Sequence, residues 1–386
     1  MRSDAVRMLS MLMAGVAALA AAALPGGAAA AEARLDPATA AAIRASASGP
    51  AVIAHRGASA LRPEHTLEAY ALAIAEGADF VEPDLVMTRD GVLVARHENE
   101  IGSTTDVATH PRFASRRTVR EVDGERIDGW FIEDFSLAEL RTLRARERLP
   151  ELRSVAYDGR FAVPTFDEIV VAVAEASARD GRSIGLVPEI KHSSHFHARG
   201  LDPEAALMEA LQRHAYTRRA PVGVQSFEVG NLQRLRGLLD AAGLRNVFLV
   251  QLIGDPQASP YDRVLAGQPR PYLQMLSPDG LAAIAGYADV LAPHLRYVLP
   301  LDAAGALAAP TPLLAAAHAA GLAVHAWTLR PETPFLPPAL RCADGLRCEA
   351  GARVEAEALA EAGVDALFAD DPGLLRRILQ ERTPAE

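Results

Sequence analysis

Residues 51–57 read Ala51-Val52-Ile53-Ala54-His55-Arg56-Gly57, a short apolar run that opens directly into charged residues. An apolar run of this length without polar alternation is typical of a strand buried on both faces. Similar runs recur, and we expect strands at 51–54, 80–84, 184–190, 221–225, 247–250, 289–292, 323–327 and 366–369. Amphipathic patterns separate them and predict helices at 66–76, 165–179, 203–214, 228–241, 311–320 and 353–362.

This alternation of strands and helices predicts parallel βα units. Eight strands are the number in a TIM (β/α)8 barrel, and residues 48–386 are enough for such a barrel with insertions. The alternative is a doubly wound open sheet, but no Gly-x-Gly-x-x-Gly pattern follows an early strand. We therefore expect one α/β barrel domain over 48–386.

A further apolar run at 92–96 begins too soon after the second strand to be a ninth parallel strand, because a parallel crossover needs about a dozen residues. Thr88-Arg89-Asp90-Gly91 is typical of a turn, so we expect a hairpin above the second strand. A turn centred on Asp90 and Gly91 would place His97 opposite Asp84, at the rim of the barrel.

A long insertion follows this hairpin and comes after the second strand of the barrel. It spans 98–163, is polar with scattered aromatic residues, and has one helical pattern near 137–147. Long insertions on the catalytic side of a barrel often shape a substrate pocket, and we expect this role here.

The composition restricts the possible partners. Half of the 386 residues are apolar, and the formal net charge is -10. A surface that follows nucleic-acid phosphates needs a basic face, so we expect no nucleic-acid partner. A small anionic molecule remains a suitable partner, because a pocket can be locally positive on an acidic protein.

The N-terminal residues 1–31 have the pattern of a secretory signal peptide. Arg2 and Arg7 precede an apolar run at 8–24, and the small residues 28–31 offer a cleavage site. The apolar run has about 17 residues, fewer than the roughly 20 that a membrane-spanning helix needs. We expect cleavage, a periplasmic or secreted mature protein, and no stable membrane insertion. The alternative is an uncleaved membrane anchor.

Cys342 and Cys348 are the two cysteines of the chain, which are too few for a disulfide scaffold. They lie six positions apart in a segment punctuated by Pro and Gly. In an oxidising compartment they can form a local disulfide that staples a loop, and we expect this bond. The alternative is two free thiols.

Three carboxylates lie at the ends of predicted strands, which form the active face of a barrel. Glu82 and Asp84 end the second strand on the same side, and Glu189 ends the third. Carboxylates crowded together repel one another unless a cation lies between them, and oxygen ligands favour Ca²⁺ or Mg²⁺. We expect Glu82, Asp84 and Glu189 to bind one divalent cation. The alternative is a set of solvated surface acids.

Two cations and two histidines accompany these carboxylates. Arg56 offers paired hydrogen bonds to phosphate oxygens, and Lys191 can face an anion or form an ion pair with Glu189. With a divalent cation the rim would hold about one net positive charge, which suits a phosphodiester. His55 and His97 would flank the phosphorus as general base and general acid, and we favour this order.

Ordered motifs along the chain resemble those of the glycerophosphodiester phosphodiesterase family. They are His55-Arg56-Gly57-Ala58-Ser59, Pro63-Glu64-His65-Thr66-Leu67-Glu68-Ala69-Tyr70, Glu82-Pro83-Asp84-Leu85, Glu189-Ile190-Lys191, Ala326-Trp327-Thr328 and Ala369-Asp370-Asp371-Pro372. The expected signal peptide and the long insertion resemble the periplasmic branch more than the compact cytosolic one.

The resemblance implies a TIM-barrel enzyme that uses Ca²⁺ or Mg²⁺ to cleave glycerophosphodiesters such as glycerophosphocholine. The products would be sn-glycerol 3-phosphate and an alcohol, in support of glycerophospholipid and glycerol catabolism. The attacking group would be water or the glycerol 2-hydroxyl. The family's roles fall on residues of this chain as follows: metal ligands on Glu82, Asp84 and Glu189, the catalytic pair on His55 and His97, phosphate contacts on Arg56 and Lys191, and an aromatic pocket wall on Trp327.

One residue departs from the family pattern. The family usually has Asp after the second histidine, whereas Glu98 follows His97 here, which leaves open how the acid reaches the imidazole. Two other functions stay open: a phospholipase C or D of the same superfamily, acting on phospholipid head groups, and a binding or adhesion protein that kept the fold without activity.

Overall fold

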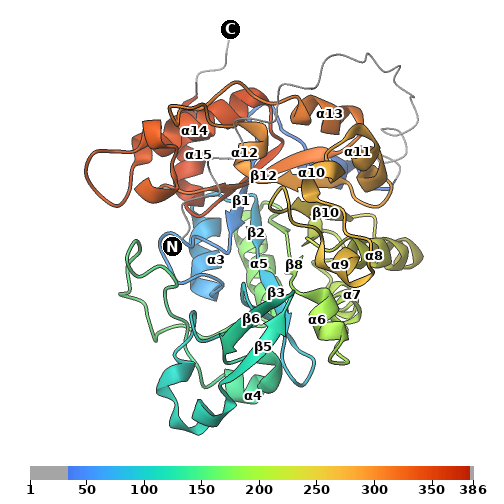
Figure 1. Cartoon of the computed structure of the whole chain (residues 1–386), viewed down its shortest axis with the longest axis vertical. Helices are drawn as coiled ribbons and strands as arrows, with labels where there is room; N and C mark the ends of the chain where they lie inside the picture. The colour runs from blue at the N-terminus through green and yellow to red at the C-terminus, as the bar shows by residue number, and fades with distance from the viewer. Residues whose placement is uncertain (1–33, 383–386) are drawn as a thin grey trace.

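The computed structural model describes residues 34–382, so the expected signal peptide over 1–31 lies outside the described residues. The predicted barrel is confirmed: its parallel sheet runs β10-β11-β12-β13-β1-β2-β7-β9, and β9 also pairs with β10 and closes it (Figure 1). These strands span Ala51–His55 (β1), Phe80–Glu82 (β2), Gly185–Leu186 (β7), Val222–Ser226 (β9), Val247–Ile253 (β10), Val290–Pro293 (β11), Ala323–Leu329 (β12) and Ala366–Ala369 (β13).

Proline residues interrupt the second and third barrel strands. Pro83 separates β2 from β3 (Asp84–Met87), and Val187 and Pro188 separate β7 from β8 (Glu189–Ile190). A proline cannot donate a ladder hydrogen bond, so each strand is broken there. Beyond the breaks, β3 and β8 pair with each other, with Asp84 opposite Glu189. This places two of the predicted metal ligands side by side.

The predicted helices are all present, within a few residues of the expected ends. They are α3 (Leu67–Ala75), α5 (Phe166–Asp180), α7 (Pro203–Arg213), α8 (Val229–Ala242), α13 (Leu313–Ala319) and α14 (Glu349–Ala362). Sequence reasoning missed the others, which are α2 (Pro37–Ala42), α6 (Ser193–His197), α9 (Tyr261–Leu265), α10 (Tyr272–Met275), α11 (Pro278–Ala285), α12 (Leu295–Val298) and α15 (Pro372–Glu381). Among residues 34–382, no helix has both the length and the apolar character needed to cross a bilayer.

The hairpin above the second strand forms, but its predicted register is wrong by one residue. Val86 pairs with Val94, and the amide of Arg96 donates to the carbonyl of Asp84 at 2.9 Å. The turn is one residue longer than expected. The Thr88 amide donates to the Val92 carbonyl, the Thr88 hydroxyl accepts from the Val92 amide, and Gly91 takes a positive φ of 80°. Arg96, not His97, therefore lies opposite Asp84, and β4 spans Leu93–Ala95.

The insertion 98–163 contains a second, two-stranded sheet that the sequence did not predict. Its strands are β5 (Thr118–Val122) and β6 (Glu125–Gly129). The helix expected near 137–147 is shorter, since α4 spans Leu137–Leu140. Figure 1 shows these elements at the lower end of the view, with β5 close to α6. Cys342 and Cys348 form a disulfide with an S–S distance of 2.05 Å, in the segment before α14.

Two aromatic rings, those of Phe80 and Phe248, meet in the interior of the barrel. Phe80 and Phe248 meet edge to face, with ring centroids 6.2 Å apart. Each ring lies over a glycine: a Cβ on Gly185 would come within 2.1 Å of Phe80, and a Cβ on Gly223 within 2.3 Å of Phe248. Glycine at these strand positions therefore makes room for the rings.

Gly185→Ala is expected to destabilise the protein by about 1–3 kcal/mol, because the added methyl group overfills a packed core. Urea unfolding measures this difference. Gly237→Ala is the matched control, since Gly237 lies within α8 with open space around its Cβ position, and alanine should gain about 0.5–1 kcal/mol there. Unchanged stability of Gly185→Ala would contradict this account of the barrel interior.

Candidate active site

The three predicted carboxylates lie together at the carboxyl ends of the barrel strands. Glu82 ends β2, Asp84 begins β3 and Glu189 begins β8. One oxygen from each lies within 4.8 Å of the others, and all three side chains are buried. The breaks at Pro83 and Pro188 bring the strand ends together, so this cluster is a direct product of the barrel topology.

The electrostatics of the cluster fit a divalent cation. Burial, followed by the charge of Asp84, raises the pKa of Glu82 well above its ordinary value. Burial also raises the pKa of Glu189 to about 8, against the opposing effect of Lys191. Among the described residues, Oδ1 of buried Asp84 has no hydrogen-bond partner. Crowded carboxylates and a free oxygen are the donor set that a hard cation such as Ca²⁺ or Mg²⁺ requires.

Arg56 lies against these carboxylates at a sharp turn after β1. Its backbone has a positive φ of 60°, and its amide donates to Glu82 at 2.7 Å. Its guanidinium donates through Nη1 to Glu64 at 3.2 Å, and its Nε lies 3.5 Å from Asp84. Gly57 follows because a Cβ there would lie 2.7 Å from the backbone of Ala69. Arg56 is therefore a buried, fixed positive charge beside the cluster.

His55 is oriented by Asp370, which follows β13. The ring Nδ1 of His55 lies 2.5 Å from a carboxylate oxygen of Asp370. Arg153 donates to the other oxygen of Asp370 at 2.5 Å, and Arg330 lies 3.0 Å from it. Burial and the nearby Arg56 lower the pKa of His55 to about 4. The ring is therefore neutral at pH 7, with Nδ1–H donating to Asp370 and Nε2 left as an acceptor.

His97 lies on the other flank of the cluster. Its Nδ1 is 2.7 Å from Glu98, and its Nε2 is 3.4 Å from Nζ of Lys191. Burial, Arg56 and Lys191 lower the pKa of His97 to about 3. Lys191 in turn lies 3.2 Å from Glu189, so it links the histidine to the carboxylates. The departure at Glu98 is thus resolved in the structure, since the longer side chain does reach the imidazole.

Trp327 lies on β12 and packs against Phe227. Its Nε1 donates to the carbonyl of Ala292 at 2.8 Å. Its ring meets that of Phe227 edge to face at 6.0 Å, and Nζ of Lys191 lies 5.8 Å from the centre of the Phe227 ring. Trp327 therefore reaches the site through Phe227, in keeping with a position in a pocket wall.

Sequence reasoning missed several polar residues that hold the site in place. Their contacts are Glu64 with Arg56, His65 with Asp84 at 2.9 Å, Gln225 with Glu82 at 2.9 Å, and Asp370 with His55. Glu64 and His65 belong to the motif at 63–70 and Asp370 to the motif at 369–372, so the signal was present in the sequence. The sequence did not show, however, that these motifs contact the residues at the strand ends.

A second group, His197, Asp202 and Glu204, also has the spacing of a metal site. Arg234 already occupies its centre, with Nη1 2.8 Å from an oxygen of Asp202 and 2.8 Å from an oxygen of Glu204. Asn231 also donates to Glu204. This group is therefore a structural ion-pair network.

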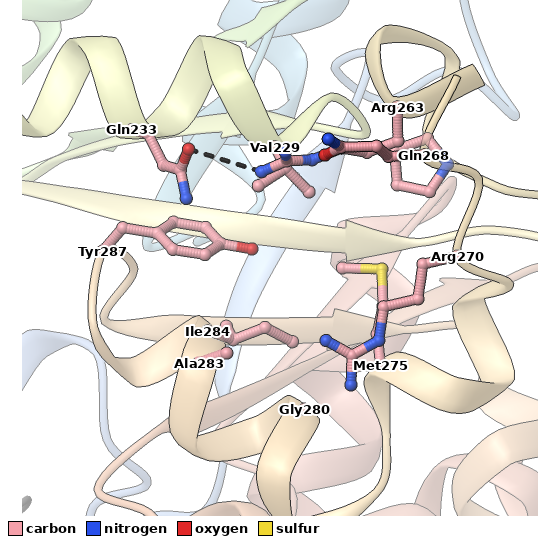
Figure 2. A pocket seen from close by; sticks show the side chains of 11 residues that line it. Val229, Gln233, Arg263, Gln268, Arg270, Met275, Gly280, Ala283, Ile284 and Tyr287 are labelled. Atoms are coloured by element: carbon pink, nitrogen blue, oxygen red, sulfur yellow. Dashed lines mark hydrogen bonds between the residues drawn. The ribbon is translucent and has the colours of Figure 1, made fainter. Parts of the chain in front are cut away.

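A cavity of about 290 Å³ lies on the flank of the barrel, between α8 and α11. Figure 2 shows the hydrogen bond from Arg263 to Gln233 and the apolar side chains of Met275 and Ile284, all among the residues that line it. The predicted site residues are not among those that line it. The candidate active site is therefore identified by its side-chain chemistry, and this cavity is separate from it.

The sequence model of the "Glycerophosphoryl diester phosphodiesterase family" matches residues 55–374. Glycerophosphodiester phosphodiesterase GDPD6 of Arabidopsis thaliana is 31% identical over 350 residues, covering 87% of this chain and 88% of its own. A glycerophosphodiester phosphodiesterase of Haemophilus influenzae is 30% identical over 260 residues, covering 63% of this chain and 68% of its own.

Two solved structures share the fold. A putative glycerophosphoryl diester phosphodiesterase from Silicibacter pomeroyi superposes with a TM-score of 0.59 at 23% identity, covering 88% of this chain and 95% of that one. A phosphodiesterase from Oleispira antarctica, solved in complex with the product sn-glycerol-3-phosphate, superposes with a TM-score of 0.55 at 22% identity, covering 86% of this chain and 98% of that one.

Proposed function

Because this chain belongs to the glycerophosphoryl diester phosphodiesterase family, we propose that it hydrolyses glycerophosphodiesters to sn-glycerol 3-phosphate and an alcohol, with a divalent cation at Glu82, Asp84 and Glu189. The arrangement of charged side chains at the site supports this reaction. The buried carboxylate cluster is bordered by Arg56 and Lys191 and flanked by two histidines, each oriented by its own carboxylate.

The oxygen-only donor set favours Ca²⁺ or Mg²⁺. When bound, such a cation neutralises charge on the phosphoryl oxygens and acidifies a hydroxyl or water near it. Arg56 and Lys191 add fixed positive charge for the same oxygens. Both are buried, so their attraction for the anionic substrate is screened less by water than that of a surface cation.

The two histidines then move protons. Asp370 holds the Nδ1–H of His55, so Nε2 accepts a proton from the attacking oxygen. Glu98 holds Nδ1 of His97, so Nε2 is the atom that gives a proton to the departing alcohol. The negative charge of a bound phosphodiester favours the protonated form of this ring. The attacking group is water or the glycerol 2-hydroxyl.

A product assay tests the reaction. Purified protein with Ca²⁺ or Mg²⁺ should release sn-glycerol 3-phosphate and choline from glycerophosphocholine in equal amounts, measured by a coupled dehydrogenase assay and by chromatography. Phosphocholine and glycerol as products would mean that the other phosphoester bond is cleaved, as in a phospholipase C. Cleavage of phosphatidylcholine in preference to glycerophosphocholine would also contradict the proposal.

We also propose that the mature protein is periplasmic or secreted. The pattern of charged, apolar and small residues over 1–31 supports export. The disulfide between Cys342 and Cys348 gives independent support, because such bonds persist in oxidising compartments. N-terminal sequencing of protein recovered outside the cytosol should find a start near residue 31, and recovery of the uncleaved chain from the cytosol would contradict this.

A further inference from the structure

The hairpin of the insertion ends in a tight two-residue turn. Val122 pairs with Glu125, and the intervening Asp123 and Gly124 have positive φ values of 50° and 83°. This is the backbone of a turn that suits Asp-Gly and the twist of the two strands. The turn presents the carboxylate of Asp123 to the loop that follows β8, where it lies 2.7 Å from Nδ1 of His192.

His192 joins this turn to the acid behind the catalytic histidine. Its other nitrogen, Nε2, lies 3.1 Å from Oε2 of Glu98. Its backbone has a positive φ of 50°, a conformation that few residues other than glycine adopt. The loop therefore holds a mostly buried imidazole between two carboxylates that are 25 positions apart in the sequence.

Both ring nitrogens of His192 face a carboxylate, so both must donate, which only the protonated ring can do. Burial lowers the pKa of this ring, but Asp123 and Glu98 outweigh burial and raise it to about 9. Partial burial raises the pKa of Glu98, but the hydrogen bonds with His192 and His97 outweigh it and hold this pKa below its ordinary value. Glu98 is therefore an ionised carboxylate held by a positively charged histidine.

Glu98 uses its second oxygen on His97. Oε1 lies 2.7 Å from Nδ1 of His97, while Oε2 is on His192. A glutamate has one more rotatable bond than an aspartate, and it is more than one-third exposed here. Unless its far oxygen is anchored, this side chain can rotate away from the imidazole. His192 supplies that anchor.

We propose that His192 is a positioning residue for the proposed reaction: it fixes Glu98 against Nδ1 of His97, and Asp123 of the inserted hairpin fixes His192. The inference rests on the proposed role of His97. It gives the insertion a definite task, since Asp123 reaches the catalytic histidine through two side chains without contacting the carboxylate cluster. In Figure 1 the hairpin and α6, which follows His192, lie next to each other.

His192→Ala is expected to lower kcat for glycerophosphocholine about tenfold, as is typical when a residue that orients a functional side chain is lost. KM and the metal concentration for half-maximal activity should stay within about twofold of the native values, because binding groups are untouched. In a Glu98→Gln background, His192→Ala should cost less than about twofold, because its effect passes through Glu98. A purely structural role would lower activity equally in both backgrounds.

Two further variants keep the test decisive. Asp123→Asn keeps the turn, because Asn also tolerates positive φ, and it should lower kcat about two- to fivefold by weakening the hold on His192. His197→Ala removes a nearby histidine that is paired with Glu204 outside the site, and it should leave kcat unchanged. Melting temperatures show whether each variant folds.

The outcomes separate this inference from the proposed function. Full activity of folded His192→Ala and Asp123→Asn, alongside an inactive His97→Ala, would overturn the role of His192 alone. Equal losses from His192→Ala with and without Glu98→Gln would overturn it as well. An active His97→Ala would instead overturn the proposed function of His97, and the inference with it.

Discussion

Changing His97 to alanine is expected to lower kcat for glycerophosphocholine by about 10²–10⁴-fold, the usual contribution of a general acid or base. The structure supports a role in proton transfer, because Glu98 holds Nδ1 of the ring and Nε2 lies 3.4 Å from Lys191, which is bonded to the carboxylate cluster. Steady-state kinetics at several substrate concentrations measure the loss. KM should change little, since the histidine acts on the departing oxygen and is not a main binding group.

The leaving group distinguishes an acid from a base. A glycerophosphodiester with a p-nitrophenyl leaving group needs no protonation of the departing oxygen, so His97→Ala should recover most of its activity on this substrate. His55→Ala should stay impaired on both substrates. The reverse result would exchange the two roles while keeping the catalytic pair.

His110→Ala is the matched control, because this histidine belongs to the insertion and pairs with Asp106 away from the site. It should keep native activity. A loss of kcat of less than about tenfold in both His55→Ala and His97→Ala would show that the two histidines are not the catalytic acid and base, since such groups contribute more than this.

The barrel could be predicted because its strands carry the simplest pattern in the sequence. Each of the eight is a short apolar run that is buried on both faces, and each forms within a few residues of its expected place. The hairpin β5–β6 could not be predicted by the same rule. Most of its residues are exposed and polar, so apolar periodicity is missing, although Asp123-Gly124 was a turn signal. The helix α15 was missed even though Pro372 follows an N-capping Asp371.

The site could be predicted as far as it lies on strand ends. The barrel topology brings Glu82, Asp84 and Glu189 together independently of the loop conformations, so the sequence alone was enough to predict this cluster. The partners that orient the histidines come from elsewhere: Asp370 is 315 positions from His55, and His192 is 94 positions from Glu98. Pairings across such distances depend on how loops fold over the rim, and one sequence holds no pattern that specifies them.

The largest effect should come from the carboxylate cluster. Glu189→Gln, or removal of divalent cations with EDTA, is expected to lower kcat by about 10³-fold or more, because a catalytic cation contributes several kcal/mol to the transition state. Adding Ca²⁺ or Mg²⁺ should restore the native enzyme after EDTA treatment and should not restore Glu189→Gln. The cation that restores more activity identifies the better fit among the two.

Thermal unfolding gives a second measurement that does not depend on turnover. A cation that binds the folded state alone stabilises it by about 2.7 kcal/mol at a hundredfold excess over Kd, so the native melting temperature should rise when Ca²⁺ or Mg²⁺ is added. Glu189→Gln should lose this rise. Its melting temperature without cation should stay close to that of the native protein, because the substitution relieves crowding against Asp84 but also breaks the buried ion pair with Lys191.

Asp202→Asn is the control for this experiment, since Asp202 belongs to the other acidic group, whose centre Arg234 occupies. It should keep both the activity and the cation-dependent rise. If the cation-dependent increase in melting temperature persisted in Glu189→Gln and disappeared in Asp202→Asn, the cation would bind at the second group instead.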